Sequence, residues 1–117
     1  MERSKALAAL SALSQGARLD LVRLLMPCGD AGMAAGAIGA QLGLAASRLS
    51  FHLSALEQAG LIRSRRESRN VIYAINLDGM GRTIAYLLND CCRDHPQVVA
   101  CCHRAAPDQP FTLPQAR

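Results

Sequence analysis

Four of the five cysteines lie near the end of the chain as two adjacent pairs, Cys91 with Cys92 and Cys101 with Cys102. Thiolates are the protein ligands that soft metal ions prefer. In a reducing compartment, clustered cysteines serve more often as ligands or reactive groups than as structural disulfides. Two pairs on either side of Pro96 are hard to explain by packing alone. The pattern therefore predicts a site for a thiophilic ion.

Helix geometry limits how these thiols can share one ion. Successive helical residues point about 100° apart, so Cys91 and Cys92 can converge only where a helix ends. Pro96 requires such an end, because the residue before a proline avoids helical backbone angles. Residues 93–100 then let the chain return with a third thiolate from the second pair. Three thiolates suit trivalent arsenic, and the same spacing also permits zinc or cadmium on four thiolates.

The remaining candidate ligands are two histidines and the fifth cysteine. His95 and His103 could add borderline-soft nitrogen ligands, but we expect both to be exposed to solvent. Cys28 is expected to stand apart from the site. The residues leave several ligands open, namely arsenite, antimonite, a methylated trivalent arsenical, zinc and cadmium. A disulfide between the two pairs would instead make the site a redox sensor.

Helices must position these thiols. A composition rich in alanine and leucine, with two tyrosines, two phenylalanines and no tryptophan, favours packed helices over a large sheet. Hydrophobic periodicity predicts helices over residues 4–14, 17–26, 34–42, 45–59 and 78–91. Gly43 and Gly60 are suited to end the third and fourth of these in a left-handed conformation. Asp78 is the expected cap of the last helix.

After Gly60 the pattern changes to that of strands. Residues 61–65 and 70–75 are β-like runs, and residues 66–69 join them as a hairpin. We therefore expect a mainly α-helical fold with a small β-hairpin. Residues 104–117 contain three prolines and no periodicity, so a mobile tail is expected there.

The excess positive charge is concentrated in the middle of the chain. The formal net charge is +4, and residues 45–76 carry five arginines against two glutamates, a net +3. The planar guanidinium suits phosphate groups and guanine edges better than an ammonium does. Two helices joined at Gly43 and followed by a hairpin with arginines at its tip have the order of a winged helix-turn-helix. In that fold the second helix enters the major groove of duplex DNA.

The helix expected at residues 45–59 is the candidate recognition helix. If Leu49, Leu53 and Leu56 face inward, polar and aromatic side chains project from the opposite side, and the hairpin arginines can reach phosphates or the minor groove. The helix lacks a polar cap at Ala45, for which Ser47 could substitute. The candidate DNA-contacting residues are Ser47, Arg48, Ser50, Phe51, His52, Arg65, Arg66 and Arg69. For His52, a structural role is the alternative.

The stretches Ile38–Ile62 and Arg65–Tyr73 resemble the ArsR/SmtB family of metal- and metalloid-responsive repressors. The resemblance covers about residues 4–95. It implies a homodimeric winged helix-turn-helix repressor that an inducer releases from double-stranded operator DNA. The first and last helices form the dimer interface in that family. Here they correspond to the apolar stripes at residues 6–13 and 80–91.

One branch of that family senses arsenite through an adjacent cysteine pair after the last helix and one cysteine further on. Cys91 and Cys92 match that pair. The resemblance therefore implies As(III) as the inducer, with Cys101 or Cys102 as the third ligand. The acid-and-histidine pairs of the zinc-sensing branch are not evident on residues 78–91.

Several other classes of protein are disfavoured. No apolar run approaches the roughly 20 residues that cross a bilayer, and the N-terminus resembles an amphipathic helix, so a cytoplasmic protein with no membrane partner is expected. An enzyme is not expected, because no phosphate-binding glycine loop and no nucleophile with a recognisable base is found. A thiol-based metal carrier is the alternative from another class. The expected domains are a DNA-binding and dimerisation domain at residues 1–95 and a cysteine-containing segment with the tail at residues 96–117.

Overall fold

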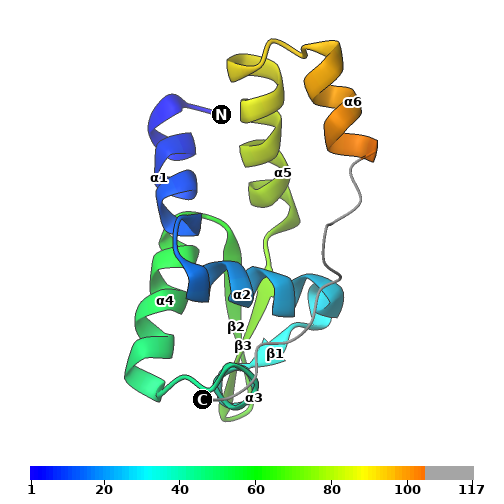
Figure 1. The fold of residues 1–117 in the computed structure, drawn as a ribbon. Helices are drawn as coiled ribbons and strands as arrows, with labels where there is room; N and C mark the ends of the chain where they lie inside the picture. Colours follow the sequence, from blue (N-terminus) through cyan, green and yellow to red (C-terminus); the bar gives the residue numbers. More distant parts are fainter. Residues whose placement is uncertain (105–117) are drawn as a thin grey trace.

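The computed structural model describes residues 1–104, so nearly all of the expected tail lies outside the described residues. The elements are α1 (Arg3–Leu13), α2 (Gly16–Leu25), the 3-10 segment η1 (Met26–Ala31), β1 (Met33–Ala34), α3 (Ala35–Leu42), α4 (Ala46–Gln58), β2 (Ile62–Glu67), β3 (Asn70–Ile75), α5 (Leu77–Ala85), its π-helical continuation η2 (Tyr86–Cys91) and α6 (Pro96–Arg104). Helices α1, α5 and α6 gather at one end of the molecule, and α3 and the hairpin tip lie at the other (Figure 1). The fold is thus mainly helical with a small sheet, as predicted.

The core forms where α2, α3 and α4 pack against the base of the sheet. Its fully buried large side chains are all aliphatic: Leu21, Leu25, Ile38, Leu53, Leu56, Leu61, Ile62 and Ile75. On α4, Leu49, Leu53 and Leu56 are 5%, 2% and 0% exposed, which confirms the inward-facing row expected from their spacing. The other side of α4 is therefore left toward solvent.

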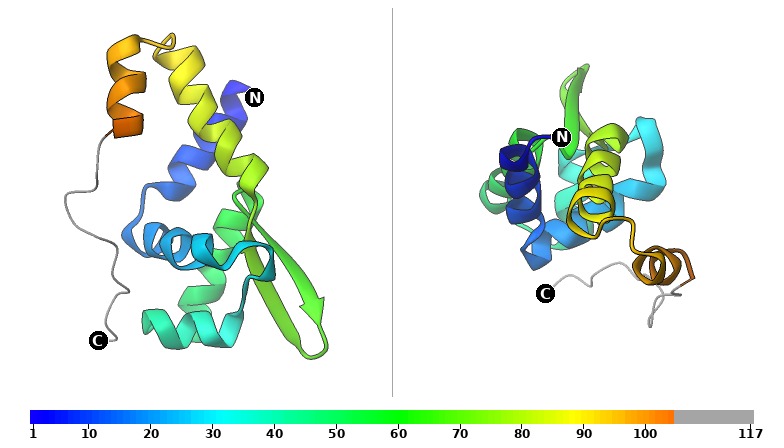
Figure 2. Two further views of the ribbon diagram at one scale, coloured as in Figure 1. Left: turned by 90° about the vertical axis from the view of Figure 1, so that its right-hand side faces the viewer. Right: turned by 90° about the horizontal axis from the view of Figure 1, so that it is seen from above.

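The sheet is antiparallel with the strand order β1-β3-β2. Ile62 pairs with Ile75 at its base and Glu67 pairs with Asn70 near its tip, where Ser68 turns the chain with a φ of 56°. These strands confirm the predicted hairpin, which projects from the helical body as a wing (Figure 2). Strand β1 was not predicted, because a strand of two residues has no periodicity to detect.

Glycines end the two helices of the helix-turn-helix unit. Gly43 follows α3 with a φ of 65°, and Gly60 follows α4 with a φ of 80°. Both have the left-handed backbone that was expected of them. At the start of α4, Ala45 is the N-cap and no side chain caps the helix. The substitute cap expected from Ser47 is therefore wrong, because this helix leaves its first amide groups uncapped by side chains.

The cap of α5 is Asn76 rather than Asp78. The Asn76 Oδ1 accepts a hydrogen bond from the backbone N of Gly79 at 3.2 Å, and its Nδ2 donates to the carbonyl of Gly60 at 3.0 Å. Asp78 lies inside the first turn and pairs with Arg82 at 2.9 Å. The amide group of Asn76 can satisfy the end of α4 and the start of α5 together, which a carboxylate cannot do because it has no donor.

Helix α1 uses its smallest side chains for the core. Ala6, Ala9 and Ala12 are 1%, 0% and 7% exposed, whereas Leu7 is 55% exposed. On the neighbouring α5 and η2, Ile84 and Leu87 are also exposed. The large apolar side chains of the predicted stripes thus lie partly on the surface. Within residues 1–104, no helix combines the length and the apolar character needed to cross a membrane.

Candidate nucleic-acid interface and thiol cluster

The first half of α4 presents an exposed face with mixed chemistry. Ser47, Arg48, Ser50 and Phe51 are all exposed, and Phe51 is 66% exposed despite its apolar ring. Hydroxyl and guanidinium groups can donate to base edges and phosphates, and an aromatic ring can pack on a thymine methyl group. The arrangement leaves all four of these predicted side chains accessible to a groove of DNA.

His52 differs from these four because it is only 3% exposed. Its Nδ1 accepts a hydrogen bond from the Nε of Arg18, a residue of α2, at 3.1 Å. Burial, and then the charges of Arg18 and Arg48, lower the pKa of His52 from its ordinary value of 6.5. In this conformation the imidazole is neutral and contacts Arg18 instead of projecting outward.

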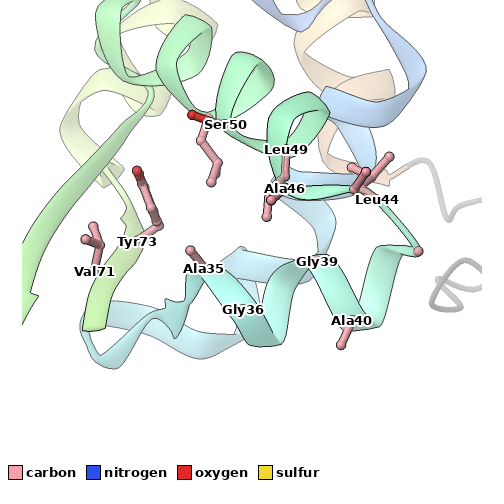
Figure 3. Close-up of a pocket in the computed structure, with 13 residues that line it drawn as sticks. Ala35, Gly36, Gly39, Ala40, Leu44, Ala46, Leu49, Ser50, Val71 and Tyr73 are labelled. Atoms are coloured by element: carbon pink, nitrogen blue, oxygen red, sulfur yellow. The ribbon is translucent and has the colours of Figure 1, made fainter. Parts of the chain in front are cut away.

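A hollow of about 600 Å³ separates the helix-turn-helix unit from the wing (Figure 3). Small side chains of α3, including Ala35 and Ala40, line one side, and Val71 and Tyr73 of β3 line another. The hydroxyl of Tyr73 points toward the side of α4 that carries Ser50. Burial, and secondarily the charge of Glu57, raise the pKa of Tyr73. Its hydroxyl therefore keeps its proton and can donate a hydrogen bond near neutral pH.

The predicted arginines of the wing lie on different sides of it. Arg65 is exposed but bonded to other residues of the chain: its Nη1 and Nη2 donate to the carbonyls of Asp30 and Ala31 at 2.8 and 2.9 Å, and its Nε pairs with Glu67 at 2.6 Å. These bonds tie the wing to η1. A contact between Arg65 and DNA, which the sequence predicted, has to compete with three existing bonds.

Arg66 lies on the face of the wing that is turned toward α4. It is directly opposite Val71 on β3, and Ser64 is directly opposite Tyr73, so these four residues share one face of the sheet. Val71 and Tyr73 line the hollow beside α4, whereas Arg65 has the opposite orientation. Arg69 is exposed in the turn at the tip. Arg66 and Arg69 are therefore the wing arginines best placed to act together with α4.

The cysteine pairs lie at the end of η2 and on α6. Cys91 ends η2 and is exposed, Cys92 is partly buried, and Cys101 and Cys102 are exposed on α6. All of them are free thiols, as is Cys28. The Sγ of Cys28 donates to the carbonyl of Leu24 at 3.5 Å, on another part of the chain.

The turn between the two pairs has an unusual backbone. The amide of Cys92 donates to the carbonyl of Leu87 at 2.9 Å with the five-residue spacing of a π-helix, and the amide of Asp94 donates to the carbonyl of Leu88, six residues back, at 2.8 Å. Arg93 and Asp94 follow with φ values of 54° and 52°, a conformation that costs a residue with a Cβ atom about 1 kcal/mol. π-Helical turns of this kind occur often at functional sites.

Helix α6 was not predicted, because Pro96 was interpreted only as a stop for the preceding helix. Here Pro96 is the first helical residue, a position where its missing N–H group costs nothing. The Nδ1 of His95 accepts a hydrogen bond from the backbone N of Gln97 at 3.2 Å and so supports this start. The residues after Pro96 thus carry the second cysteine pair on a helix.

The two pairs do not form a preassembled ion site. Among residues 1–104, no group of three or more His, Cys, Asp and Glu side chains is close enough to hold a metal ion. The second pair instead lines a hollow of about 530 Å³ beside α6, together with His95, Gln97 and Val98. Free thiols are thus present at the end of η2 and on α6, in two separate pairs.

Comparisons with known proteins agree with this geometry. Residues 13–65 match a helix-turn-helix domain model. The HTH-type transcriptional regulator YgaV of Escherichia coli (strain K12) is 36% identical over 88 residues, which cover 75% of this chain and 87% of that protein. The chain belongs to the ArsR-like family of winged helix-turn-helix transcriptional regulators.

Two solved structures of the family extend the comparison. The homodimeric winged helix-turn-helix DNA-binding domain Mb0332 from Mycobacterium bovis, a possible ArsR-family regulator, is 26% identical with a TM-score of 0.62, over 92% of this chain and 89% of that one. A possible transcriptional regulator for arsenical resistance is 25% identical with a TM-score of 0.62, over 79% and 93%.

Membership of this family makes the chain a DNA-binding transcriptional regulator. These relatives are transcriptional regulators and not enzymes, which also argues against the thiol-based metal carrier considered from the sequence. In helix-turn-helix proteins the second helix of the unit enters the major groove, and α4 is the second helix of the unit here.

Sequence reasoning missed Arg18. It lies on α2, outside the basic middle of the chain, and its partner His52 is 34 residues away. A pairing at that separation leaves no local pattern. The one local signal is that Arg18 is a charged residue on α2, a helix that packs several of its apolar side chains into the core.

Proposed function

We propose that the protein is a dimeric repressor whose affinity for operator DNA falls when As(III) binds Cys91, Cys92 and one of Cys101 or Cys102. The observation that carries the proposal is the placement of two free-thiol pairs on either side of the left-handed turn that ends α5 and η2. Trivalent arsenic takes three thiolate ligands, and its softness matches sulfur better than nitrogen or oxygen. The match of Cys91 and Cys92 to the cysteine pair of the arsenite-sensing branch points the same way, as does the name of the arsenical-resistance relative.

Because the two cysteine pairs are separate, binding of one As(III) ion by both pairs requires a change of conformation. Because three donors do not already lie together in residues 1–104, As(III) has to draw α6 toward η2. The turn at Arg93 and Asp94 carries a backbone cost that a different conformation of the turn can release. The backbone hydrogen bonds of η2, which join residues five apart, can rearrange to the four-residue spacing of an α-helix. Ligand binding and the shape of this helix end are thereby coupled.

The dimer supplies the route from the thiols to DNA. Helices α1 and α5 lie side by side at one end of the molecule, and they expose Leu7, Ile84 and Leu87 (Figure 1). A second copy packed on this surface would bury these side chains. The recognition helices of a dimer must sit one helical turn of DNA apart, roughly 34 Å. A shift at the end of α5 changes that spacing, and couplings of this kind are commonly about 1–3 kcal/mol.

A thiol-redox switch is the second candidate function. It is favoured by the exposure of Cys91, Cys101 and Cys102 and by the lack of three converging donors among the described residues. In that case one thiol of each pair joins in a disulfide. Hydrogen peroxide takes the two electrons and the two thiol protons and leaves as two molecules of water. Zinc or cadmium on four thiolates is the remaining alternative at the same residues.

Titration of a protein–DNA complex separates these functions. DNA that the protein itself selects from a random pool serves as the operator, and fluorescence anisotropy follows release by arsenite, antimonite, zinc, cadmium or peroxide. We expect arsenite to release the wild type and Cys28→Ser, but not Cys92→Ser. Single serine variants at Cys101 and Cys102 then identify the third ligand. Release by arsenite from a variant that lacks both cysteine pairs would refute the proposal, and release by peroxide alone would favour the redox switch.

The proposed action also sets the compartment. A regulator that reaches chromosomal DNA in a bacterium and keeps its cysteines reduced is expected in the cytoplasm. The predicted operator contacts remain those on α4 and the wing, with Arg66 and Arg69 foremost among the wing arginines.

A further inference from the structure

A single side chain of α2 joins three helices at the back of the recognition surface. The guanidinium of Arg18 donates through Nε to the Nδ1 of His52 at 3.1 Å and through Nη1 to the carbonyl of Ala12, near the end of α1, at 3.4 Å. The same guanidinium lies over the ring of Phe51, 5.5 Å from its centroid. A planar guanidinium can donate in its plane while it stacks on an aromatic face, which a lysine cannot reproduce.

The hydrogen bond to Arg18 fixes the state of His52. Arginine only donates, so the Nδ1 of His52 has to be an unprotonated acceptor and the ring proton has to lie on Nε2. The charged groups that act on the imidazole are Arg18 from α2 and Arg48 from its own helix, and α1 contributes the Ala12 carbonyl to Arg18. A protonated imidazole would lose its bond to Arg18 and would face two guanidinium groups.

The bond to His52 also supports Phe51. The two rings meet edge to face, with centroids 5.6 Å apart, and Arg18 covers one face of the Phe51 ring. These contacts hold a side chain that is otherwise 66% exposed. A hollow of about 330 Å³ lies there, and its lining includes Ser47 and Arg48 as well as the two rings. Arg18 and His52 thus form the support of the surface that carries the predicted base contacts.

We infer that Arg18 is a positioning residue for DNA recognition, which acts through neutral His52 and the ring of Phe51 to hold α4 at a fixed angle to α2. The inference rests on DNA binding through α4 and does not depend on the inducer. One consequence is that acid, which usually strengthens the attraction of a basic protein to DNA, here weakens specific binding by breaking the bond between Arg18 and His52.

The test compares DNA affinity across pH for matched variants. Lowering the pH from about 7.5 to about 5.5 should weaken specific binding by the wild type about three- to fivefold, because protonation of His52 breaks its bond to Arg18 and a pKa lowered from 6.5 leaves the ring only partly protonated at the lower pH. The affinity of His52→Asn, at whatever level it starts, should change less than about twofold, because the amide oxygen can accept from Arg18 and does not titrate. An equal pH response in both proteins would overturn the inference.

Substitution of Arg18 provides the second arm. Arg18→Ala should weaken specific binding about tenfold, and Arg18→Lys should recover part of this loss because it keeps one donor and the charge. Arg3→Ala removes an exposed guanidinium from the first turn of α1 and is the charge-matched control. Equal effects of Arg18→Ala and Arg3→Ala would mean that only charge was lost, and would also overturn the inference.

A measurement on the unmodified protein covers the case in which Arg18→Ala does not fold. Nitrogen-15 NMR of the histidine rings should show the Nδ1 of His52 unprotonated at neutral pH, with the change to imidazolium coinciding with the loss of DNA affinity. A His52 ring that carries its proton on Nδ1 contradicts the inference. Release by arsenite is measured separately in Arg18→Lys. The role of Arg18 in DNA binding and the release by arsenite thus have separate measurements, and failure of one does not imply failure of the other.

Discussion

Glu57, near the end of the recognition helix α4, accepts two hydrogen bonds from Ser64 on strand β2 of the wing, one from its backbone N at 3.1 Å and one from its hydroxyl at 2.6 Å. The helix and the wing approach DNA from different directions, and this pair of bonds fixes the angle between them. A winged helix-turn-helix needs that angle, because its helix occupies a groove while its wing reaches the neighbouring backbone.

Removal of the Glu57 carboxylate should loosen the wing. We expect Glu57→Ala to lower the free energy of unfolding by about 1 kcal/mol and to weaken specific DNA binding several-fold, since both bonds to Ser64 are lost. Ser64→Ala keeps the backbone bond and should have a smaller effect on both quantities. Urea denaturation and anisotropy measure the two properties. A larger effect from Ser64→Ala would contradict this role for the carboxylate.

Arg48 and Arg66 should affect DNA binding in different ways. Arg48 is exposed in the first turn of α4, so Arg48→Ala should relax the preference among base sequences, by about 1–3 kcal/mol at one position. Arg66, on the face of the wing toward α4, should act on phosphates, so Arg66→Ala should weaken all sequences alike and lower the salt slope by about one. Binding to a panel of single-base variants at several salt concentrations distinguishes the two roles. Identical specificity profiles would contradict the assignment.

Arg65 should matter more for stability than for DNA. Its guanidinium joins the wing to the carbonyls of Asp30 and Ala31, so Arg65→Ala should lower the free energy of unfolding by about 1 kcal/mol, allowing for its partial exposure. Arg66→Ala removes the same charge from the next position and should change stability by less than about 0.5 kcal/mol. Equal stability losses of the two variants in urea denaturation would contradict this stabilising role of Arg65.

His52 should make stability depend on pH. In the unfolded chain its pKa has the ordinary value of 6.5, and in the folded protein burial and Arg18 lower it. Below about pH 6.5 the unfolded chain therefore binds this proton more readily than the folded protein does, and the free energy of unfolding decreases as the pH is lowered. Denaturation at about pH 7.5 and 5.5 tests this. His103→Asn, a change at an exposed histidine, should retain the fall, whereas His52→Asn should reduce it.

Arsenite and zinc should respond differently to pH at the same thiols. Arsenous acid brings three hydroxyl groups, which leave as water with three thiol protons, so its binding should be nearly independent of pH between about 6 and 8. Zinc brings no hydroxyl group and displaces the thiol protons into solution, so its binding should tighten over this interval. Isothermal titration in two buffers of different ionisation enthalpy counts the protons. A steep pH dependence for arsenite would argue against three neutral thiols as its partners.

Much of the DNA-facing half could be predicted because its signals are local. The leucine row of α4, the glycines that end the two helices and the change to strand periodicity all arise within a few residues. Strand β1 is too short for any pattern. The bond from Arg65 to the carbonyl of Asp30 and the bond from Arg18 to His52 join residues more than 30 positions apart. Only the folded chain brings such residues together.

For the cysteine-containing end of the chain, the candidate ligands were predicted but the secondary structure was not. Its cysteines were identified from their clustering, whereas α6 was missed because a proline can either end one helix or begin another. Which side of α1 faces the core was not predicted. Leucine ranks above alanine in hydrophobicity, but close packing of this helix on its neighbours favours the smaller side chain.

The alanine side of α1 has a consequence for the assembly as a whole. Three methyl groups set how deeply this helix sinks into its own subunit, and Leu7 on its outer surface moves with them. In the proposed dimer, a bulkier residue at Ala9 would push the outer surface of α1 away from its own subunit. The distance between the recognition helices α4 of the two subunits would then change. The separation of the two half-sites that such a dimer can bind on DNA would thus depend on buried methyl groups that contact neither the second copy nor the DNA.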